Sequence, residues 1–156
     1  MYLTQQTDYA LRVLIYAAVN NQQLITIADI AKTYSLPKSY LMKVCALLVR
    51  LGFLESVRGK NGGLRLASPA ETINVGTVVR SVETVDIVEC MRNKQLCPLI
   101  SCCCLAPILS GAAEQFLTYL DQFTLNQLIN NPTIAKLHYM PQASLSNKAA
   151  ETETTA

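Results

Sequence analysis

The sequence lacks any long uninterrupted apolar stretch, and its first residues do not form a basic segment followed by an apolar one. Charged residues such as Arg12 and Lys32 divide every apolar run before it reaches the length of a membrane-spanning helix. The opening residues, Met-Tyr-Leu-Thr-Gln-Gln-Thr-Asp, do not have the pattern of a secretory signal. We therefore expect a cytoplasmic protein with no membrane association, and 51 % hydrophobic residues are enough for a globular core.

The sequence also has few residues arranged for zinc binding. It has one histidine, His138, and no pair of cysteines at CxxC-like spacing, although it has six cysteines. A disulfide framework is disfavoured in a cytoplasmic protein, so metal binding or thiol chemistry is the better interpretation. Cys45 lies among apolar neighbours and is interpreted as a packing residue. We find no nucleophile–base pair, no paired carboxylates and no cofactor-binding loop, and we therefore do not expect an enzyme.

The cations are concentrated in one segment. The net charge of the chain is only +2, but residues 32–65 contain seven lysines and arginines against one acid, Glu55. This segment therefore carries +6, and the rest of the chain carries −4. A basic stripe on an otherwise mildly acidic protein is typical of a nucleic-acid surface, although a solvated helix face would give the same pattern.

Hydrophobic periodicity and helix-capping residues predict a mainly α-helical protein. Thr7 and Thr26 are expected helix starts, Asn74 is expected to cap a later helix, and Gly52 is an expected left-handed helix end. Thr124 with Gln127 forms another start signal. The expected helices cover Thr7–Asn20, Ile27–Tyr34, Pro37–Leu51, Val75–Val82, Leu105–Gln122 and a short segment that ends at Asn130.

The second and third of these helices form a helix-turn-helix pattern, because the turn Ser35-Leu36-Pro37 joins them and the third helix is basic. The strands expected at Phe53–Val57 and Leu64–Leu66 enclose the glycine-rich turn Arg58-Gly59-Lys60-Asn61-Gly62-Gly63. A β-hairpin directly after the recognition helix is the wing of a winged helix. A phosphate-binding loop of a nucleotide hydrolase is the competing interpretation, but the segment lacks a Gly-Lys-Ser/Thr ending.

This helix and this hairpin are expected to bind double-stranded DNA. Helix side chains would read the major groove, while the wing cations would enter the minor groove or pair with phosphates. Glycine in the turn permits positive φ and a close approach of the backbone to a phosphate. The candidate DNA-binding residues are Lys38, Ser39, Tyr40 and Lys43 on the helix, and Arg58, Lys60, Asn61, Gly62, Gly63 and Arg65 on the wing.

The rest of the chain suggests a dimer. The helix that begins at Leu105 has a broader apolar stripe than one small domain can cover, so we expect it to form a homodimer interface. The alternative is that it folds back on its own domain. The expected organisation is a winged helix-turn-helix region at 1–68, a connector helix and cysteine loop at 69–104, a dimerisation region at 105–132 and a tail at 133–156, disordered from about residue 141.

Five of the cysteines lie close together in the sequence. Six residues separate Cys90 from Cys97, and Cys102, Cys103 and Cys104 are consecutive. Thiolates are suitable ligands for iron–sulfur clusters and for zinc. Consecutive side chains point in different directions, so at most two of the three adjacent cysteines are expected to bind one metal. Buried apolar cysteines, a thiol redox switch and a zinc site are the alternatives that the spacing leaves open.

Three stretches of the sequence carry a family resemblance. They are Leu3-Thr4 with Thr7-Asp8-Tyr9-Ala10-Leu11-Arg12, the wing sequence from Val57 to Leu66, and the cysteine loop. With these stretches the chain resembles the NsrR family of nitric-oxide-sensing repressors, in the winged-helix superfamily that also contains the iron–sulfur regulator IscR. The resemblance covers about residues 1–132, and the wing sequence is its most specific part.

The resemblance implies that three cysteines bind an iron–sulfur cluster, a 4Fe–4S cluster rather than a 2Fe–2S cluster. Cys90 and Cys97 match the first two ligands. Cys103 matches the third, because Leu105 then falls on the family's helix-leading leucine. Either neighbouring cysteine could replace it, and the additional cysteines are a departure from the family pattern.

The fourth ligand distinguishes the two kinds of relative. IscR-like proteins use a histidine three residues after the third cysteine, and this chain has Ala106 there. NsrR-like proteins can use an N-terminal aspartate of the partner subunit, which Asp8 matches, and Arg12 lies one helical turn further on and could orient it. The alternative for Asp8 is a simple acid in the first helical turn.

The function implied by the resemblance is a homodimeric repressor that leaves its operator when nitric oxide damages the cluster. An intact cluster would hold the cysteine loop against Asp8 and thereby fix the spacing of the two recognition helices. A regulator of the same fold that senses cluster supply or thiol oxidation is the alternative.

Overall fold

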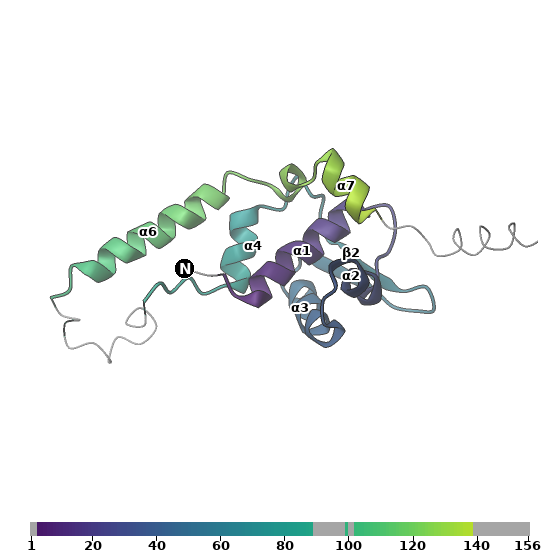
Figure 1. Cartoon of the computed structure of the whole chain (residues 1–156), viewed down its shortest axis with the longest axis horizontal. Helices are drawn as coiled ribbons and strands as arrows, with labels where there is room; N and C mark the ends of the chain where they lie inside the picture. Colours follow the sequence, from purple (N-terminus) through teal and green to yellow (C-terminus); the bar gives the residue numbers. More distant parts are fainter. Residues whose placement is uncertain (1–2, 89–98, 100–101, 139–156) are drawn as a thin grey trace, which may run out of the picture.

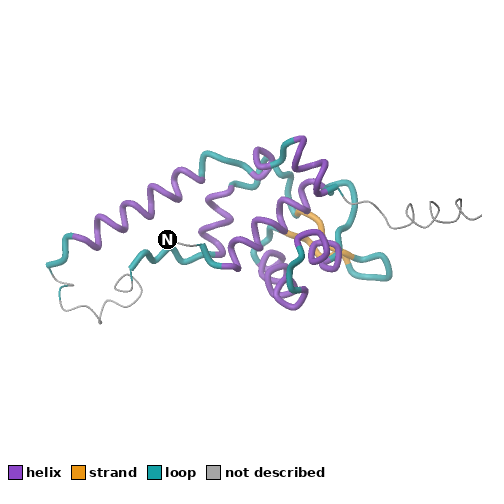
Figure 2. Tube along the Cα trace, in the orientation of Figure 1, coloured by secondary structure: helices purple, strands orange, loops and turns teal. Residues whose placement is uncertain are grey.

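The computed structural model describes residues 3–88, 99 and 102–138 of the chain. It is mainly helical with one antiparallel hairpin, as the sequence predicts (Figures 1 and 2). The elements in chain order are α1 (Gln5–Val19), α2 (Ile27–Tyr34), α3 (Lys38–Arg50), β1 (Leu54–Val57), β2 (Gly63–Leu66), α4 (Val75–Val82), α6 (Leu105–Leu120), the 3₁₀ helix η2 (Leu125–Leu128) and α7 (Asn131–Leu137).

Helix α1 is the central element of the fold. It packs against α3, β2, α4, η2 and α7, and Figure 1 shows it between α3 on one side and α7 on the other. Its side chains are accordingly buried on more than one face: Ala10, Val13 and Leu14 have no exposed surface, and Tyr16 is 1 % exposed. The apolar residues of α1 therefore hold the helix-turn-helix, the wing and the remaining helices together.

The beginning of α1 differs from the sequence prediction. The N-cap is Thr4, whose hydroxyl accepts a hydrogen bond from the Thr7 amide at 3.4 Å. Thr7, the predicted cap, lies inside the first turn, fully buried, and its hydroxyl donates to the Glu83 carboxylate at 2.7 Å. Two threonines at this spacing offer alternative starts, and the Glu83 carboxylate at the C-cap of α4 accepts hydrogen bonds from both of them.

Local capping signals position the helix-turn-helix. The capping box that begins α2 is confirmed, because the Thr26 hydroxyl and the Asp29 carboxylate each accept the other residue's amide. Ser35 ends α2 with a left-handed backbone, at φ 53°, which turns the chain directly into α3. Pro37 is the N-cap of α3 rather than a residue of its first turn. Gly52, at φ 80°, is the left-handed residue predicted after α3.

The wing has the predicted two strands, in a register that pairs Leu54 with Leu66 and Val57 with Gly63. Leu54 is 2 % exposed and Leu64 is 8 % exposed, so the base of the hairpin forms part of the core. Ile25, in the loop before α2, adds an antiparallel bridge to Leu64, with N–H···O distances of 2.8 and 2.9 Å. This bridge, which the sequence analysis does not predict, fixes the wing relative to α1 and α2.

Helices α4 and α6 extend the fold away from the wing. Asn74 caps α4 as predicted, and Arg80 of α4 forms hydrogen-bonded ion pairs with Asp121 at the end of α6, at 2.5 and 2.8 Å. From this junction at its C-terminal end, α6 extends away from the other helices toward its N-terminal end at Leu105 (Figure 1). None of the helices in the described ranges is both long and apolar enough to span a bilayer.

Helix α7 is an element that the sequence prediction omits. Asn130 caps it by accepting the Thr133 amide at 2.9 Å, and Pro132 occupies its first turn. The Asn20 side-chain amide at the end of α1 donates to the Leu137 carbonyl oxygen at 3.0 Å, which attaches α7 to α1. The short predicted helix before α7 is present as η2, with the expected capping box of Thr124 and Gln127.

Candidate DNA interface and metal-ligating residues

One face of α3 is buried and the opposite face is exposed. Leu41, Val44 and Leu48 are at most 1 % exposed and pack into the core. The predicted contacts Lys38, Ser39 and Lys43 lie on the exposed face. No acid occupies the first turn of α3, so its positive helix end and its two lysines attract phosphate together.

Met42 belongs to the same exposed face but is not among the predicted DNA contacts. Its side chain is 54 % exposed, next to Lys43 and one turn after Ser39. The signal available in the sequence is the i+3 spacing from Ser39, which places both residues on one helix face. An exposed thioether among polar neighbours can contact a thymine methyl group in a major groove.

Tyr40 has a packing role in this structure. Its ring is partly buried and contacts the ring of Tyr9 on α1 edge to face, with centroids 5.2 Å apart and an interplanar angle of 81°. The contact joins the first turn of α3 to the first half of α1. A role for Tyr40 in reading bases stays a prediction, while its support of α3 is a direct observation.

The tip of the wing presents free polar groups. Arg58, Lys60 and Asn61 are all exposed, and neither cation has an ion-pair partner among the described residues. Arg65 differs, because its guanidinium binds Glu55 across the hairpin at 2.8 Å. Arg58 and Lys60 can therefore approach a phosphate without first breaking an internal ion pair.

Two glycines of the wing are required by steric contacts within the chain. A Cβ on Gly62 would collide with the Val57 carbonyl oxygen, and a Cβ on Gly63 would lie 2.7 Å from the Ile25 carbonyl oxygen. Only Gly59 of the turn has positive φ, at 122°. Close packing within the chain is therefore sufficient to require glycine at positions 62 and 63, and contact of these two residues with DNA stays a prediction.

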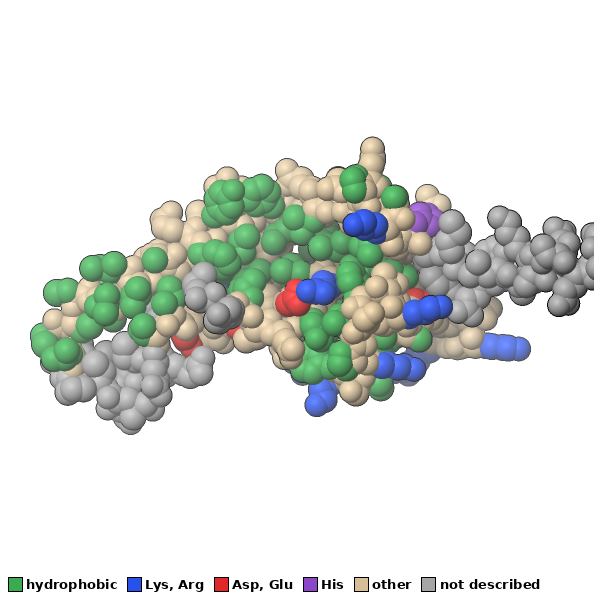
Figure 3. All heavy atoms as spheres, in the orientation of Figure 1, with side chains coloured by type: hydrophobic (Ala, Val, Ile, Leu, Met, Phe, Trp, Pro, Cys, Tyr) green, Lys and Arg blue, Asp and Glu red, His purple; other side chains and the backbone are tan. Residues whose placement is uncertain are grey.

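The charge distribution separates two surfaces. Figure 3 shows lysine and arginine side chains spread over the part of the surface that α2, α3 and the wing form, whereas hydrophobic side chains dominate the visible surface of α6. On α6, Ala113 and Leu117 are each 8 % exposed, but Leu105 is 58 % and Ile108 is 67 % exposed. The cationic surface and the apolar surface of α6 therefore lie at opposite ends of the described protein.

The predicted cluster ligands are only partly within the described residues. Cys90 and Cys97 lie outside them. Cys102, Cys103 and Cys104 directly precede α6 as free thiols, with Cys103 partly buried and its two neighbours exposed. No three His, Cys, Asp or Glu side chains of residues 3–88, 99 and 102–138 are grouped closely enough to hold a metal ion. The available thiols are chemically suited to iron, since none of the described cysteines is in a disulfide.

The fourth predicted ligand, Asp8, is fixed by neighbours. Its carboxylate accepts a hydrogen bond from Arg12 Nε at 2.9 Å, with both side chains a little under half exposed. The Arg12 guanidinium lies 5.9 Å from the ring centroid of Tyr34 on α2. The predicted orienting role of Arg12 therefore has a geometric basis in this structure.

Cys45 does not belong to a reactive site. It is 2 % exposed on the buried side of α3, and burial raises the pKa of its thiol to about 11. A thiol that remains protonated near neutral pH is a poor nucleophile and a poor metal ligand. The packing interpretation of Cys45 agrees with these observations.

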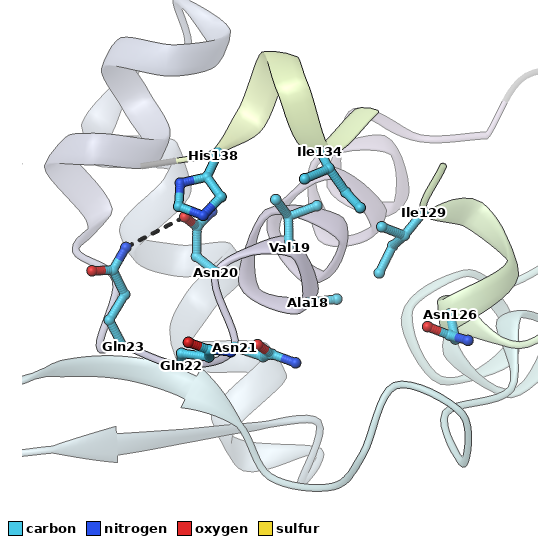
Figure 4. Close-up of a pocket in the computed structure, with 10 residues that line it drawn as sticks. All are labelled: Ala18, Val19, Asn20, Asn21, Gln22, Gln23, Asn126, Ile129, Ile134 and His138. Atoms are coloured by element: carbon cyan, nitrogen blue, oxygen red, sulfur yellow. Dashed lines mark hydrogen bonds between the residues drawn. The ribbon is translucent and has the colours of Figure 1, made fainter. Parts of the chain in front are cut away.

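A pocket of about 650 Å³ lies where the C-terminal end of α1 meets α7 (Figure 4). Val19, Ile129 and Ile134 contribute aliphatic side chains, with the Asn126 amide beside Ile129, and Gln22, Gln23 and His138 lie on the opposite side. None of the predicted metal-binding or DNA-binding residues lines it. His138 is exposed and ends α7.

Comparison with known proteins identifies the class of regulator. The family model Rrf2, described as an iron-dependent transcriptional regulator, matches residues 3–131. The chain is 46 % identical over 134 residues to the HTH-type transcriptional regulators NsrR of Bacillus licheniformis and Bacillus subtilis, which covers 84 % of this chain and 94 % and 92 % of those proteins. Among solved structures, the oxidised form of Staphylococcus aureus CymR is similar with a TM-score of 0.63 and 25 % identity, over 90 % of this chain and 99 % of that one.

These relatives are transcriptional regulators and not enzymes, and the winged helix-turn-helix prediction is confirmed at the level of the fold. The match to the family model extends from the beginning of α1 to the beginning of α7, and therefore includes the helix-turn-helix, the wing and α6. The chain belongs to the Rrf2 family of transcriptional regulators.

Proposed function

We propose that this protein is a cytoplasmic, homodimeric repressor that holds an iron–sulfur cluster and releases operator DNA in response to nitric oxide. The 46 % identity to regulators named NsrR, over 84 % of the chain, is the observation on which this function rests. The exposed face of α3, the wing cations Arg58 and Lys60, which have no ion-pair partner among the described residues, and the free thiols before α6 support it independently.

In DNA binding, α3 enters the major groove and the wing contacts the adjacent backbone. Lys38, Ser39 and Lys43 face outward for this purpose, and Lys60 reaches from the hairpin tip. In this arrangement the lysines contribute affinity that depends on salt, whereas Ser39 contributes base selectivity.

The dimer forms through α6. Leu105, Ile108 and Ala112 recur at the spacing of one helix face and are all exposed, while Ala113 and Leu117 face α4. The partner that covers this face is α6 of a second copy of the chain, because a two-fold axis places the same apolar face of each helix against that of the other. The dimer also places two recognition helices on one duplex, as an operator with two half-sites requires.

Cys90, Cys97 and Cys103 are the cluster ligands in this proposal, with Asp8 of the partner subunit in the fourth position. When bound, an iron–sulfur cluster, of the 4Fe–4S type that the family resemblance implies, would supply iron that can react with nitric oxide. Arg12 holds the Asp8 carboxylate in one orientation through the 2.9 Å hydrogen bond. An oxygen ligand binds iron less tightly than a thiolate does, so this position is the labile one.

Purification without oxygen tests the cluster directly. We expect a brown protein with thiolate-to-iron absorption, iron and sulfide in stoichiometric amounts, and a Cys97→Ala variant that is colourless and binds operator poorly. Asp8→Ala should retain a cluster but respond differently to nitric oxide. Wild-type protein that contains zinc, or that contains no metal and still binds its operator normally, would contradict the proposed sensing.

A second function is favoured by one specific observation, the two exposed free thiols of Cys102 and Cys104 beside the expected ligand Cys103. Exposed thiols can form mixed disulfides, so a thiol-oxidation regulator of the same fold is the alternative. Titration with nitric oxide and with hydrogen peroxide, followed by operator binding, separates the two functions. Release at low nitric oxide but only at high peroxide supports the cluster sensor.

A further inference from the structure

The Glu83 carboxylate connects the end of α4 to the first turn of α1. One oxygen, Oε2, accepts three hydrogen bonds: from the Thr4 amide at 2.8 Å, from the Thr4 hydroxyl at 2.8 Å and from the Thr7 hydroxyl at 2.7 Å. Burial alone would raise the pKa of this carboxyl, but the hydrogen bonds from Thr7 and Thr4 outweigh burial and lower it. Glu83 is therefore a charged acceptor that holds the N-terminal end of α1.

Glu83 lies where α4 ends and the segment with the cysteines begins. Glu83 is the C-cap of α4 and the first residue of the segment that leads to Cys90. On α1, Thr7 is fully buried and is adjacent to Asp8 in the sequence. One carboxylate thus joins the beginning of the cysteine segment to the helical turn that carries the predicted aspartate ligand.

A second contact continues from this turn to the DNA-binding surface. Tyr9 follows Asp8 in the sequence, is 8 % exposed and packs edge to face on Tyr40 of α3. Tyr40 is adjacent to Ser39, which lies on the exposed face of α3. Since packed interiors are close to incompressible, a displacement of the first turn of α1 is passed to the first turn of α3.

We propose that Glu83 is a positioning residue that couples the cysteine segment to the recognition helix of the same protomer through Thr7 and the Tyr9–Tyr40 contact. This inference rests on the proposed function, in which the cysteine segment binds the cluster. Glu83 is not a cluster ligand in this scheme. Its role is to convert the state of that segment into the position of α1.

The quantity that tests the coupling is the ratio of DNA affinities with and without the cluster. A duplex selected from a random-sequence library with cluster-loaded wild-type protein serves as the probe, and each full-length variant is measured in both states by fluorescence anisotropy under nitrogen. Glu83→Ala removes all three hydrogen bonds. Thr7→Val removes only one and retains the size and branching of the side chain. Glu71→Ala, at an exposed site, is the control, because it changes the net charge by the same amount.

Glu83→Ala should retain the wild-type iron content and should reduce the affinity ratio by about fivefold or more, the lower end of typical allosteric couplings. Thr7→Val should reduce the ratio in the same direction, and Glu71→Ala should leave it unchanged. A purely structural role for Glu83 would lower the melting temperature of both states but would not change the ratio.

An affinity ratio in Glu83→Ala and Thr7→Val equal to that of wild type would overturn the coupling while leaving the proposed function intact. If Glu83→Ala does not fold or load, Thr7→Val decides the question alone. Wild-type protein with the same affinity in both states would contradict the proposed function itself, and the coupling with it. The two failures are thus distinguished, because one is seen only in the variants and the other in the wild type.

Discussion

Lys60→Ala is the substitution that most directly tests the wing as a DNA contact. Lys60 is exposed at the hairpin tip, and no ion pair within the described part of the chain holds it. The substitution therefore removes a cation without leaving a carboxylate unpaired. Two wings contact one duplex in the proposed dimer, so the variant dimer loses two phosphate contacts.

The size of the effect follows from counterion release. Each neutralised phosphate contributes about −0.9 to the slope of log affinity against log salt, so the slope of the variant should be shallower by about 1.8. Over a fourfold increase in salt, from about 50 to about 200 mM, the affinity gap between wild type and variant should narrow by roughly tenfold. At the lowest salt the variant should bind more weakly to every duplex, since a phosphate contact carries no base preference.

Fluorescence anisotropy at several salt concentrations measures both slopes on the same duplex. Lys136→Ala is the matched control, because Lys136 is an exposed lysine on α7, which lies across α1 from α3 (Figure 1). The control should keep the wild-type slope although its net charge falls by the same amount. Equal slopes for Lys60→Ala, Lys136→Ala and the wild type would show that the wing tip does not contact phosphate.

Four further outcomes are expected. Gly62→Ala should lower the free energy of unfolding by about 1–3 kcal/mol in urea denaturation, because the Cβ of the new alanine would collide with the Val57 carbonyl oxygen. An unchanged free energy of unfolding would mean that the turn relaxes freely. Burial raises the pKa of the Cys45 thiol to about 11, so Cys45 should resist alkylation by iodoacetamide at pH 8 in the folded protein. Mass spectrometry that finds Cys45 labelled as fast in the folded protein as in the unfolded chain would contradict this prediction. Because the pKa of Glu83 is lowered from 4.5 in the folded protein, the stabilisation that its carboxylate provides is present above pH 4.5 and is lost as the pH falls through the folded-state pKa. The difference in free energy of unfolding between wild type and Glu83→Ala should therefore shrink over that range. A difference that does not change with pH would refute this prediction. Ile108→Glu should weaken the dimer by roughly a hundredfold in sedimentation experiments, because two aliphatic side chains, one from each subunit, no longer become buried. An unchanged dimer would exclude this face of α6.

The elements that local sequence signals define were predicted well. The capping box of Thr26 and Asp29, the cap at Asn74 and the left-handed Gly52 each depend on atoms within a few residues, so the sequence alone is sufficient. The start of α1 was predicted three residues too late, at Thr7 instead of Thr4, and local signals do not reveal that Thr7 is buried against Glu83, which is 76 residues beyond it.

Other features depend on partners distant in the sequence and were missed for that reason. Helix α7 has only seven residues and no buried side chain, so it lacks a periodic apolar signal, and the capping residue Asn130 was the remaining clue. The bridge between Ile25 and Leu64 joins two segments that hydrophobic patterning treats separately.

In the candidate site too, features that depend on neighbours in the sequence were predicted, and features that depend on distant residues were not. Lys38, Ser39 and Lys43 were predicted to contact DNA from the third helix, and all three are exposed in the structure. The same reasoning could not show that Arg65 is paired with Glu55, since the cross-strand register determines that contact. It also could not show that Tyr40 packs on Tyr9, because an aromatic residue in the first turn of a recognition helix can face either DNA or the core.

The arrangement of α1 explains how one small site can influence the whole DNA-binding surface. A 15-residue helix is about 22 Å long and is stiff, so its two ends move together. Its N-terminal turn carries Asp8 and the threonines bound by Glu83, and its buried faces contact both α3 and β2. In the proposed coupling, a shift at that turn changes the position of the recognition helix and of the wing at the same time. Both groups of phosphate contacts should then be lost together when the helix moves, and DNA affinity should respond more steeply than the loss of either group alone would allow.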